Sequence, residues 1–400
     1  MGLDLTFQRL KRFRLVLKNL SLLDFTIFHI YAFVKAVTKS LINLLGLILS
    51  LGFFKRGDTT LKNAKNLLVI HSAYIGDTLF LTPTLSAIKK SFPDIRIYLV
   101  LWRRYAPILE NNTYVEKILF LEDFGLQMLK ENNIDFVINY TGTLRTLIPC
   151  IAAGVKDAVG FSQQGLGFLM SRVFSKHSNS HLSEMYYSVA FNIGADNTSQ
   201  SVEYSVSKKE KVWAHKFLRQ NANNYSKSRV IIHQRAGWAA KEWPPDRYRE
   251  LMRKLSFEFS VTFIIVGSKG ELNTIKSLLP QKEDNFTACI CTDGIREISS
   301  LIEQVDLFIG SDSGFGHVAE TLGTQSILLY GPTNPTYSSP INESRHQVVV
   351  GSEPCQPTRA QYCLTDAGRK GCKTFACIRN IPVDLVFERI RPVLQDHQNR

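Results

Sequence analysis

Apolar and polar residues follow two different patterns along the chain, and the change comes near Gly57. After that point, short apolar runs alternate with stretches that have the spacing of amphipathic helices. This alternation predicts a parallel, doubly wound α/β sheet with ligands at the carboxyl ends of its strands. In the first half we predict strands at 66–71, 96–102, 117–121 and 135–139, and helices at 79–92 and 125–131.

The same alternation starts again at Arg229 and predicts a second sheet of the same kind. Residues 195–228 are rich in Asn, Ser and Lys, hold one helical stretch at 208–221, and are interpreted as the interdomain connection. The predicted domains are therefore 61–205 and 225–385, with a C-terminal helix at 384–396. The second half is predicted to contain strands at 230–233, 261–267, 306–310 and 326–331, and helices at 246–257, 271–279, 295–304 and 317–322.

Residues 1–60 form a basic, apolar extension. Nine Lys and Arg residues stand against Asp4 and Asp24 within residues 1–56, a surplus of +7 in a chain whose net charge is +13. The apolar run at 41–54 is shorter than the ~20 residues of a membrane span, and no secretory signal fits. The pattern favours amphipathic helices on an anionic membrane surface. Packing of these helices on the protein's own domain and a true span remain the alternatives.

The length of 400 residues allows two domains with full cores in addition to this extension. Outside the extension the chain is only mildly basic, and basic and aromatic residues are not interleaved over the predicted domains. The composition therefore argues against a nucleic-acid-binding surface, and no nucleic-acid partner is expected.

Two strand-to-helix turns carry the residues most suited to an anionic ligand. The first contains Gly76-Asp77, and the second contains Asp312-Ser313-Gly314 before His317. The amino terminus of a helix offers unpaired N–H groups and a partial positive charge, which suit a phosphate. Two such turns in one chain predict two domains that face a shared cleft and bind a nucleotide diphosphate.

Three segments in this order resemble the signature blocks of glycosyltransferase family 9, the ADP-heptose:lipopolysaccharide heptosyltransferases. They are HSAYIGDTLFLTPTLSAIKKSFPD, HQRAGWAAKEWPPDRYRELMRKL and GSDSGFGHVAETLGTQSILLYGPTNP, and the resemblance covers residues 66–390. It implies the GT-B architecture of two Rossmann-like domains, an N-terminal one for the acceptor and a C-terminal one for the nucleotide sugar. It also implies inverting transfer of heptose from ADP-heptose to the inner core of lipopolysaccharide, without a required cofactor.

The resemblance assigns two catalytic residues. Asp77 matches the family's base, which takes the proton of the attacking hydroxyl. Lys241 matches the lysine on the donor phosphates, where positive charge stabilises the departing diphosphate. From the residues alone, an N-cap or first-turn carboxylate of a helix is the favoured interpretation of Asp77, and a solvated loop lysine is the alternative for Lys241.

The remaining donor-binding assignments are Glu271, Arg235 and the block around His317. Glu271 matches a carboxylate that binds the ribose hydroxyls, and a carboxylate can accept both of their hydrogen bonds. Asp312, Ser313, Gly314 and His317 match the phosphate-binding block, although His317 alternatively caps its helix. Gln234-Arg235 replaces the family's usual Pro-Gly, so Arg235 either adds a cation at the diphosphate or points away.

The acceptor side is predicted to present arginines, because an inner-core acceptor carries carboxylates and phosphates that arginine binds bidentately. Arg103, Arg104 and Arg145 each follow the end of a predicted strand. A solvated surface role is the alternative for each of them.

Of the seven cysteines, Cys150, Cys289 and Cys291 lie in apolar contexts and are interpreted as core thiols. Four cluster near the C-terminus, namely Cys355, Cys363, Cys372 and Cys377. Their spacing lacks the C-x2-C pair of most zinc sites. We expect no metal site, and zinc binding, disulfides and free thiols stay open for this cluster.

The sequence thus predicts a cytoplasmic glycosyltransferase on the inner face of the inner membrane, acting on a lipid-linked acceptor. Its rivals are a transferase of the same fold for another nucleotide sugar, a non-hydrolysing sugar-nucleotide epimerase, and an inactive, membrane-tethered nucleotide-binding protein. The joint presence of Asp77 and Lys241 argues against an inactive relic. The donor sugar and base, the acceptor hydroxyl and the oligomeric state are left undecided.

Overall fold

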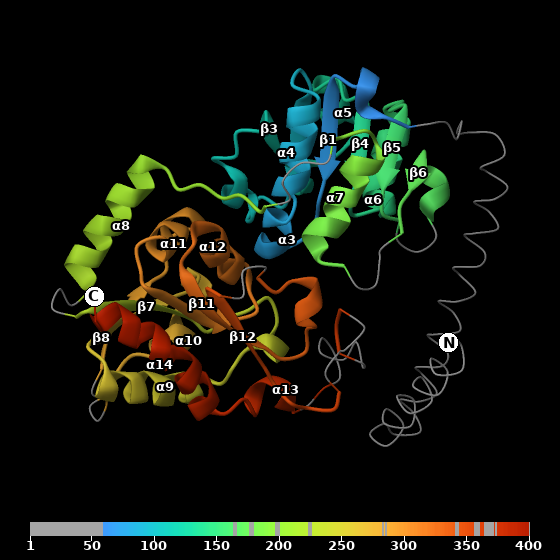
Figure 1. Cartoon of the computed structure of the whole chain (residues 1–400). Helices are drawn as coiled ribbons and strands as arrows, with labels where there is room; N and C mark the ends of the chain where they lie inside the picture. The colour runs from blue at the N-terminus through green and yellow to red at the C-terminus, as the bar shows by residue number, and fades with distance from the viewer. Residues whose placement is uncertain are drawn as a thin grey trace. The chain divides into compact units, whose positions relative to one another are not determined.

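The computed structural model describes residues 59–399, apart from 163–165, 176–179, 197–200, 223–225, 282–283, 285, 341–343, 356–360, 364–371 and 373 (Figure 1). The predicted N-terminal extension therefore lies outside the described residues, except for its last two positions. Within the described part, no helix combines the length and the apolar character needed to cross a membrane.

The described residues form two six-stranded parallel sheets. The first has the order β3-β2-β1-β4-β5-β6, in which a crossover returns the chain from β3 to the far side of β1. Its β1 is buried along its whole length, as expected for a strand covered on both faces. Its strands are β1 (Asn66–Ile70), β2 (Arg96–Leu101), β3 (Lys117–Phe120), β4 (Phe136–Asn139), β5 (Asp157–Gly160) and β6 (Arg172–Val173).

The second sheet has the order β12-β11-β10-β7-β8-β9, which is again doubly wound. Its apolar side chains pack against those of α9 (Pro245–Glu258) and α14 (Val383–Asn399) in one large core, where Trp243 is fully buried against Tyr248. The strands are β7 (Ser228–His233), β8 (Val261–Val266), β9 (Thr287–Cys291), β10 (Leu307–Ser311), β11 (Gln325–Tyr330) and β12 (His346–Val350).

The helices that join these strands are mostly amphipathic, as the sequence pattern predicts. Helix α8 begins with a capping box in which Ser207 and Glu210 satisfy each other's backbone N–H groups. The helices are α3 (Ile75–Leu79), α4 (Thr82–Ser91), α5 (Leu126–Glu131), α6 (Leu144–Ala152), α7 (Leu182–Asn192), α8 (Lys208–Asn221), α9 (Pro245–Glu258), α10 (Leu272–Lys276), α11 (Ile295–Ile302), α12 (Gly314–Leu322), α13 (Ala376–Arg379) and α14 (Val383–Asn399).

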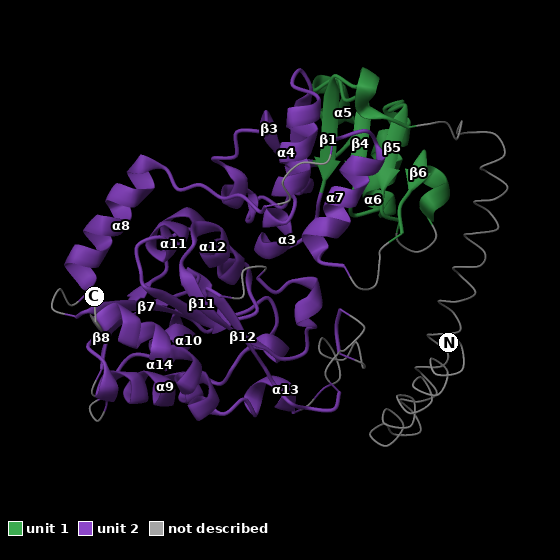
Figure 2. Ribbon diagram, in the orientation of Figure 1, with its two compact units in different colours: residues 1–70, 124–176 green, residues 71–123, 177–400 purple. Residues whose placement is uncertain are grey.

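The chain divides into two compact units (Figure 2). Unit 1 comprises Met1–Ile70 and Phe124–Lys176, and its described part holds β1, β4, β5, β6, α5 and α6. Unit 2 comprises His71–Asp123 and His177–Arg400, and it holds the second sheet together with β2, β3, α3, α4 and α7. The domain boundaries that we predict from the sequence stay predictions.

The prediction of two doubly wound parallel sheets is confirmed, but two helices begin three residues away from their predicted starts. The helix predicted at 79–92 is α4, which begins only at Thr82 because Pro83 lacks an N–H and is accommodated in a first turn, and the short helix α3 precedes it. Helix α12 begins at Gly314, three residues before the predicted start, with Ser313 at its N-cap position. His317 therefore lies inside the helix, and the interpretation that it caps the helix is wrong.

Candidate active site

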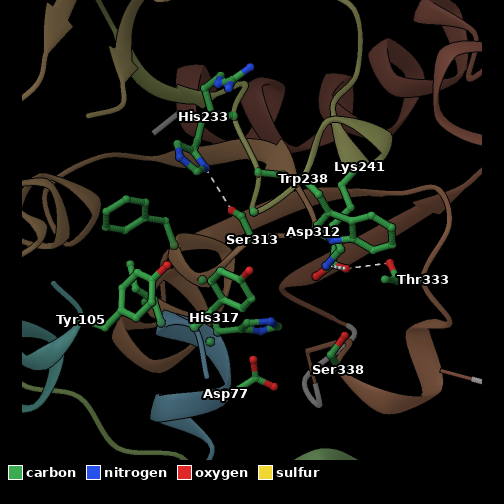
Figure 3. Close-up of a pocket in the computed structure, with 18 of the residues that line it drawn as sticks. Asp77, Tyr105, His233, Trp238, Lys241, Asp312, Ser313, His317, Thr333 and Ser338 are labelled. Atoms are coloured by element: carbon green, nitrogen blue, oxygen red, sulfur yellow. Dashed lines mark hydrogen bonds and ion pairs between the residues drawn. The ribbon is translucent and has the colours of Figure 1, made fainter. Parts of the chain in front are cut away.

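A cavity of about 540 Å³ lies within unit 2. Two stretches far apart in the sequence line it, 74–105 and 233–362, together with Leu182. Of the predicted site residues, Asp77, Arg104, Arg235, Lys241, Glu271, Asp312, Ser313, Gly314 and His317 all line this one cavity. The structure thus brings together residues of all three sequence blocks (Figure 3).

Helices α3 and α12 approach each other through two glycines. A Cβ atom on Gly76 would lie 2.7 Å from Cδ2 of His317, and one on Gly314 would lie 2.5 Å from Cβ of Ile75. Neither position has room for a larger residue, since real Cβ atoms do not come this close to another carbon atom. The close approach explains the glycine before Asp77, and it brings the Asp77 helix directly against the helix that carries His317.

The Asp77 carboxylate has an environment that suits a base. Burial raises the pKa of Asp77 above its ordinary value, the charge of Lys241 works in the opposite direction, and the Asp312 carboxylate raises the pKa further. A raised pKa makes a carboxylate a stronger proton acceptor. Figure 3 shows Asp77 beside His317 in the same cavity.

Lys241 and Asp312 form a largely buried ion pair. Nζ of Lys241 lies 2.6 Å from Oδ2 of Asp312, and the two side chains are only 16% and 5% exposed. The hydroxyl of Thr333 donates to the same carboxylate oxygen at 2.6 Å. Burial alone would raise the pKa of Asp312, but Lys241 and Thr333 outweigh it and lower that pKa. Asp312 therefore stays ionised and fixes the position of the Lys241 ammonium.

The amino terminus of α12 is left without a side-chain cap, because its N-cap residue is engaged elsewhere. The hydroxyl of Ser313 pairs with Nδ1 of His233 at 3.0 Å instead of turning back to the helix. Burial lowers the pKa of both His233 and His317 to about 4, so both imidazoles are neutral at pH 7. An anion at this helix end would be bound by backbone N–H groups and the helix dipole, not by a charged histidine.

Glu271 and Arg235 meet at the start of the segment that follows β8. Nε of Arg235 lies 3.3 Å from Oε1 of Glu271, and Nη1 of Arg235 lies 2.6 Å from Oε2 of Glu242. The backbone N–H of Ser268 donates to Oε2 of Glu271 at 2.8 Å. Arg235 is thus paired with two carboxylates. The sequence predicts Glu271 as a site residue, and it does not predict Glu242.

The three predicted acceptor arginines lie in different surroundings. Arg104 is exposed, stacks over the ring of Tyr105 at 4.6 Å and lines the cavity. Arg103 pairs with the exposed carboxylate of Asp123 at 2.6 Å and does not line the cavity. Arg145 is exposed in the first turn of α6, in unit 1. The acceptor role of each stays a prediction.

The four C-terminal cysteines influence one another electrostatically. Burial, and then the thiols of Cys355, Cys363 and Cys372, raise the pKa of Cys377 to about 12. The described cysteines form no disulfide, and no group of three or more metal-ligating side chains occurs among the residues that the structure describes. Much of the chain between these cysteines lies outside those residues, so their state stays open.

Sequence reasoning missed the aromatic wall of the cavity. Tyr74 packs against Tyr105 with 5.7 Å between the ring centroids, and Trp238 packs against Tyr362 at the same separation. Tyr74 stands three residues before Asp77 and Trp238 three residues before Lys241, so nearness to a predicted catalytic residue was the available signal. Tyr362 had none, because its segment reaches the cavity through a bridge to Thr333, which is distant in the sequence.

Comparison with known proteins identifies the class of this fold and site. The model of "Glycosyltransferase family 9 (heptosyltransferase)" matches residues 126–367, more than half of the chain. The chain belongs to glycosyltransferase family 9 and is a glycosyltransferase, as its sequence blocks predict. The matched range contains the blocks of Lys241 and Asp312, and it begins after Asp77.

Individual relatives agree with this assignment. The chain is 26% identical to lipopolysaccharide heptosyltransferase 3 of Escherichia coli K12 over 305 residues, which cover 72% of this chain and 88% of that protein. Its fold is similar to the family 9 glycosyltransferase of Veillonella parvula, with a TM-score of 0.69 at 18% identity, covering 85% of this chain and 100% of that one. It is also similar to E. coli ADP-heptose lps heptosyltransferase II, with a TM-score of 0.66 at 19% identity, covering 83% and 99%.

Proposed function

We propose that the enzyme transfers heptose from ADP-heptose to the inner core of lipopolysaccharide and inverts the configuration of the anomeric carbon. The observation that carries this proposal is the single cavity in which Asp77, the Lys241–Asp312 pair and the uncapped end of α12 meet. The family supports heptose as the sugar, and the relatives named above support a lipopolysaccharide acceptor.

The reaction needs two groups that act on opposite sides of the anomeric carbon. Asp77 accepts the proton of the acceptor hydroxyl while its oxygen attacks that carbon. The bond between the carbon and the diphosphate breaks, and ADP leaves with an added negative charge. Lys241 and the backbone N–H groups of α12 stabilise this charge. A single displacement of this kind inverts the anomeric centre and needs no covalent intermediate.

The donor's nucleoside is assigned to the part of the cavity around Glu271. This carboxylate is held by Ser268 and Arg235, and its remaining lone pairs suit the two ribose hydroxyls. Ser313, Gly314 and His317 line the neighbouring region, which we assign to the diphosphate. We further propose that the enzyme acts in the cytoplasm, with residues 1–60 on the inner membrane beside the lipid-linked acceptor.

A donor screen tests the proposal. The enzyme is given ADP-heptose, other ADP-sugars and UDP-sugars, with and without inner-core acceptor, and both nucleotide release and glycoside formation are measured. The proposal predicts acceptor-dependent turnover of ADP-heptose. Preference for another donor would favour a different transferase, and conversion of a nucleotide sugar without acceptor would favour an epimerase.

A further inference from the structure

Arg235 occupies a position that differs from the family pattern, and its contacts show what it can do. It is the second residue after β7, at the start of the loop that ends in Lys241 and Glu242. Its side chain is 31% exposed and reaches two carboxylates, Glu242 at 2.6 Å and Glu271 at 3.3 Å. One guanidinium between two carboxylates leaves a local charge of −1, so Arg235 offers no surplus positive charge to a diphosphate.

The contact with Glu242 closes the loop between β7 and α9. The second oxygen of Glu242 accepts the backbone N–H of Ala236 at 3.3 Å, so this carboxylate holds two adjacent residues at the start of the loop. The Glu242 side chain is only 10% exposed and does not line the cavity. Because Lys241 immediately precedes Glu242, the same contact restrains the backbone that presents the Lys241 ammonium.

The contact with Glu271 fixes a second group of the site. Oε1 of Glu271 accepts a hydrogen bond from Arg235, and Oε2 accepts one from the backbone N–H of Ser268. These two bonds fix the orientation of the carboxylate plane. Burial opposes ionisation of Glu271, but the bonds from Ser268 and Arg235 outweigh it and lower its pKa. An ionised, oriented carboxylate keeps lone pairs for both hydroxyls of a ribose.

We infer that Arg235 is a positioning residue, which orients Glu271 toward the donor's ribose hydroxyls and steadies the Lys241 loop, and that it does not contact the diphosphate. The inference rests on the proposed function, because it takes ADP as the nucleotide. According to this inference, the enzyme's preference for ribose over 2′-deoxyribose depends on Arg235, although Arg235 contacts neither sugar. A guanidinium is suited to this role, because its planar fork reaches two carboxylates at once, whereas an ammonium is a single point.

The test measures the binding of ADP, 2′-deoxy-ADP and AMP to the full-length enzyme by calorimetry. In Arg235→Gln the preference for ADP over 2′-deoxy-ADP should fall about tenfold, the worth of one hydrogen bond to a charged group. Glu242→Gln should keep that preference, because the contact between Arg235 and Glu271 remains. It should instead weaken the preference for ADP over AMP. Arg391→Gln is the matched control, since it removes an Arg–Glu pair of 2.7 Å that lies outside the cavity.

Two results would overturn the inference. If Arg235→Gln keeps the 2′-hydroxyl preference and loses more of the preference for ADP over AMP than Glu242→Gln does, Arg235 is itself a phosphate ligand. If the variant keeps both preferences, Arg235 orients neither Glu271 nor the Lys241 loop. Should Arg235→Gln fail to fold, Arg235→Lys gives the same readout, with a partial loss of the 2′-hydroxyl preference expected and no loss overturning the inference. A wild-type enzyme that binds none of the three nucleotides would instead refute the proposed function.

Discussion

The ammonium of Lys241 lies 2.6 Å from the carboxylate of Asp312, and both side chains are largely buried. The first prediction concerns this pair. Lys241→Ala should lower kcat and kcat/KM together, by about 10²–10³-fold, because the lost charge matters most as the diphosphate departs. Steady-state kinetics with ADP-heptose measures it. A rise in KM with unchanged kcat would make Lys241 a binding residue that does not stabilise the leaving group.

Substitution of Asp312, the other member of this pair, should have a different effect. Asp312→Asn removes the charge that holds the Lys241 ammonium, and leaves a largely buried cation without its counter-ion. The free energy of unfolding should fall by about 3–5 kcal/mol, the cost of breaking a buried ion pair. Denaturant unfolding measures this loss, with Asp123→Asn as a control that breaks an exposed pair. Equal effects of the two substitutions would show that burial adds nothing to the Lys241–Asp312 pair.

Asp77→Asn should reduce transfer by about 10²–10⁴-fold, the usual contribution of a general base, while the affinity for ADP barely changes. In the wild type, kcat/KM should rise with pH through the raised pKa of Asp77, and this limb should be absent from the residual activity of Asp77→Asn. Near-normal turnover of the variant would refute the assignment.

The same substitution has a predicted effect on stability, which separates lost chemistry from lost fold. The pKa of Asp77 is higher in the folded protein than its ordinary value of 3.8, so ionisation of this group costs stability as pH rises through the raised pKa. Asn removes that cost, and the Tm of Asp77→Asn at pH 7 should be no lower than that of the wild type. A clearly lower Tm would mean that the carboxylate has a structural role.

Gly76→Ala tests the contact between α3 and α12. Its new Cβ would lie 2.7 Å from the His317 ring, and overpacking of this kind costs about 1–3 kcal/mol. The double variant Gly76→Ala/His317→Ala should recover part of this loss, and chemical denaturation of all three variants measures the coupling. Additive effects would show that the two residues do not meet in the folded enzyme.

The features of this site that depend on neighbouring residues could be predicted from the sequence. Those that depend on residues far apart in the sequence could not. The buried runs of β1 and β10 and the turns after them are local patterns, so both sheets and the positions of Asp77 and Asp312 could be predicted. The pairing of Arg235 with Glu271 joins residues 36 positions apart. It depends on β7 lying beside β8, which no local pattern shows. Tyr362 reaches the cavity through a bridge to Thr333 and was missed for the same reason.

Deletion of residues 1–56 tests the proposed membrane contact. Each Lys or Arg near an anionic surface contributes about 1 kcal/mol of binding that salt weakens, and the apolar side chains add a part that salt leaves. The truncated enzyme should lose affinity for anionic vesicles and activity on membrane-embedded acceptor, and keep its activity on a water-soluble acceptor fragment. Vesicle sedimentation and the two assays measure this. Aggregation or unfolding of the truncated enzyme would show that the segment packs on the enzyme.

The anomeric configuration of the product tests the central proposal most directly. The enzyme is incubated with ADP-heptose and an inner-core acceptor fragment, and NMR follows the anomeric carbon while ADP release is counted. The account predicts one glycosidic bond for each ADP released, with a configuration opposite to that of the donor. A product that retains the donor's configuration would contradict a single displacement with Asp77 as the base. ADP release without glycoside formation would contradict transfer itself.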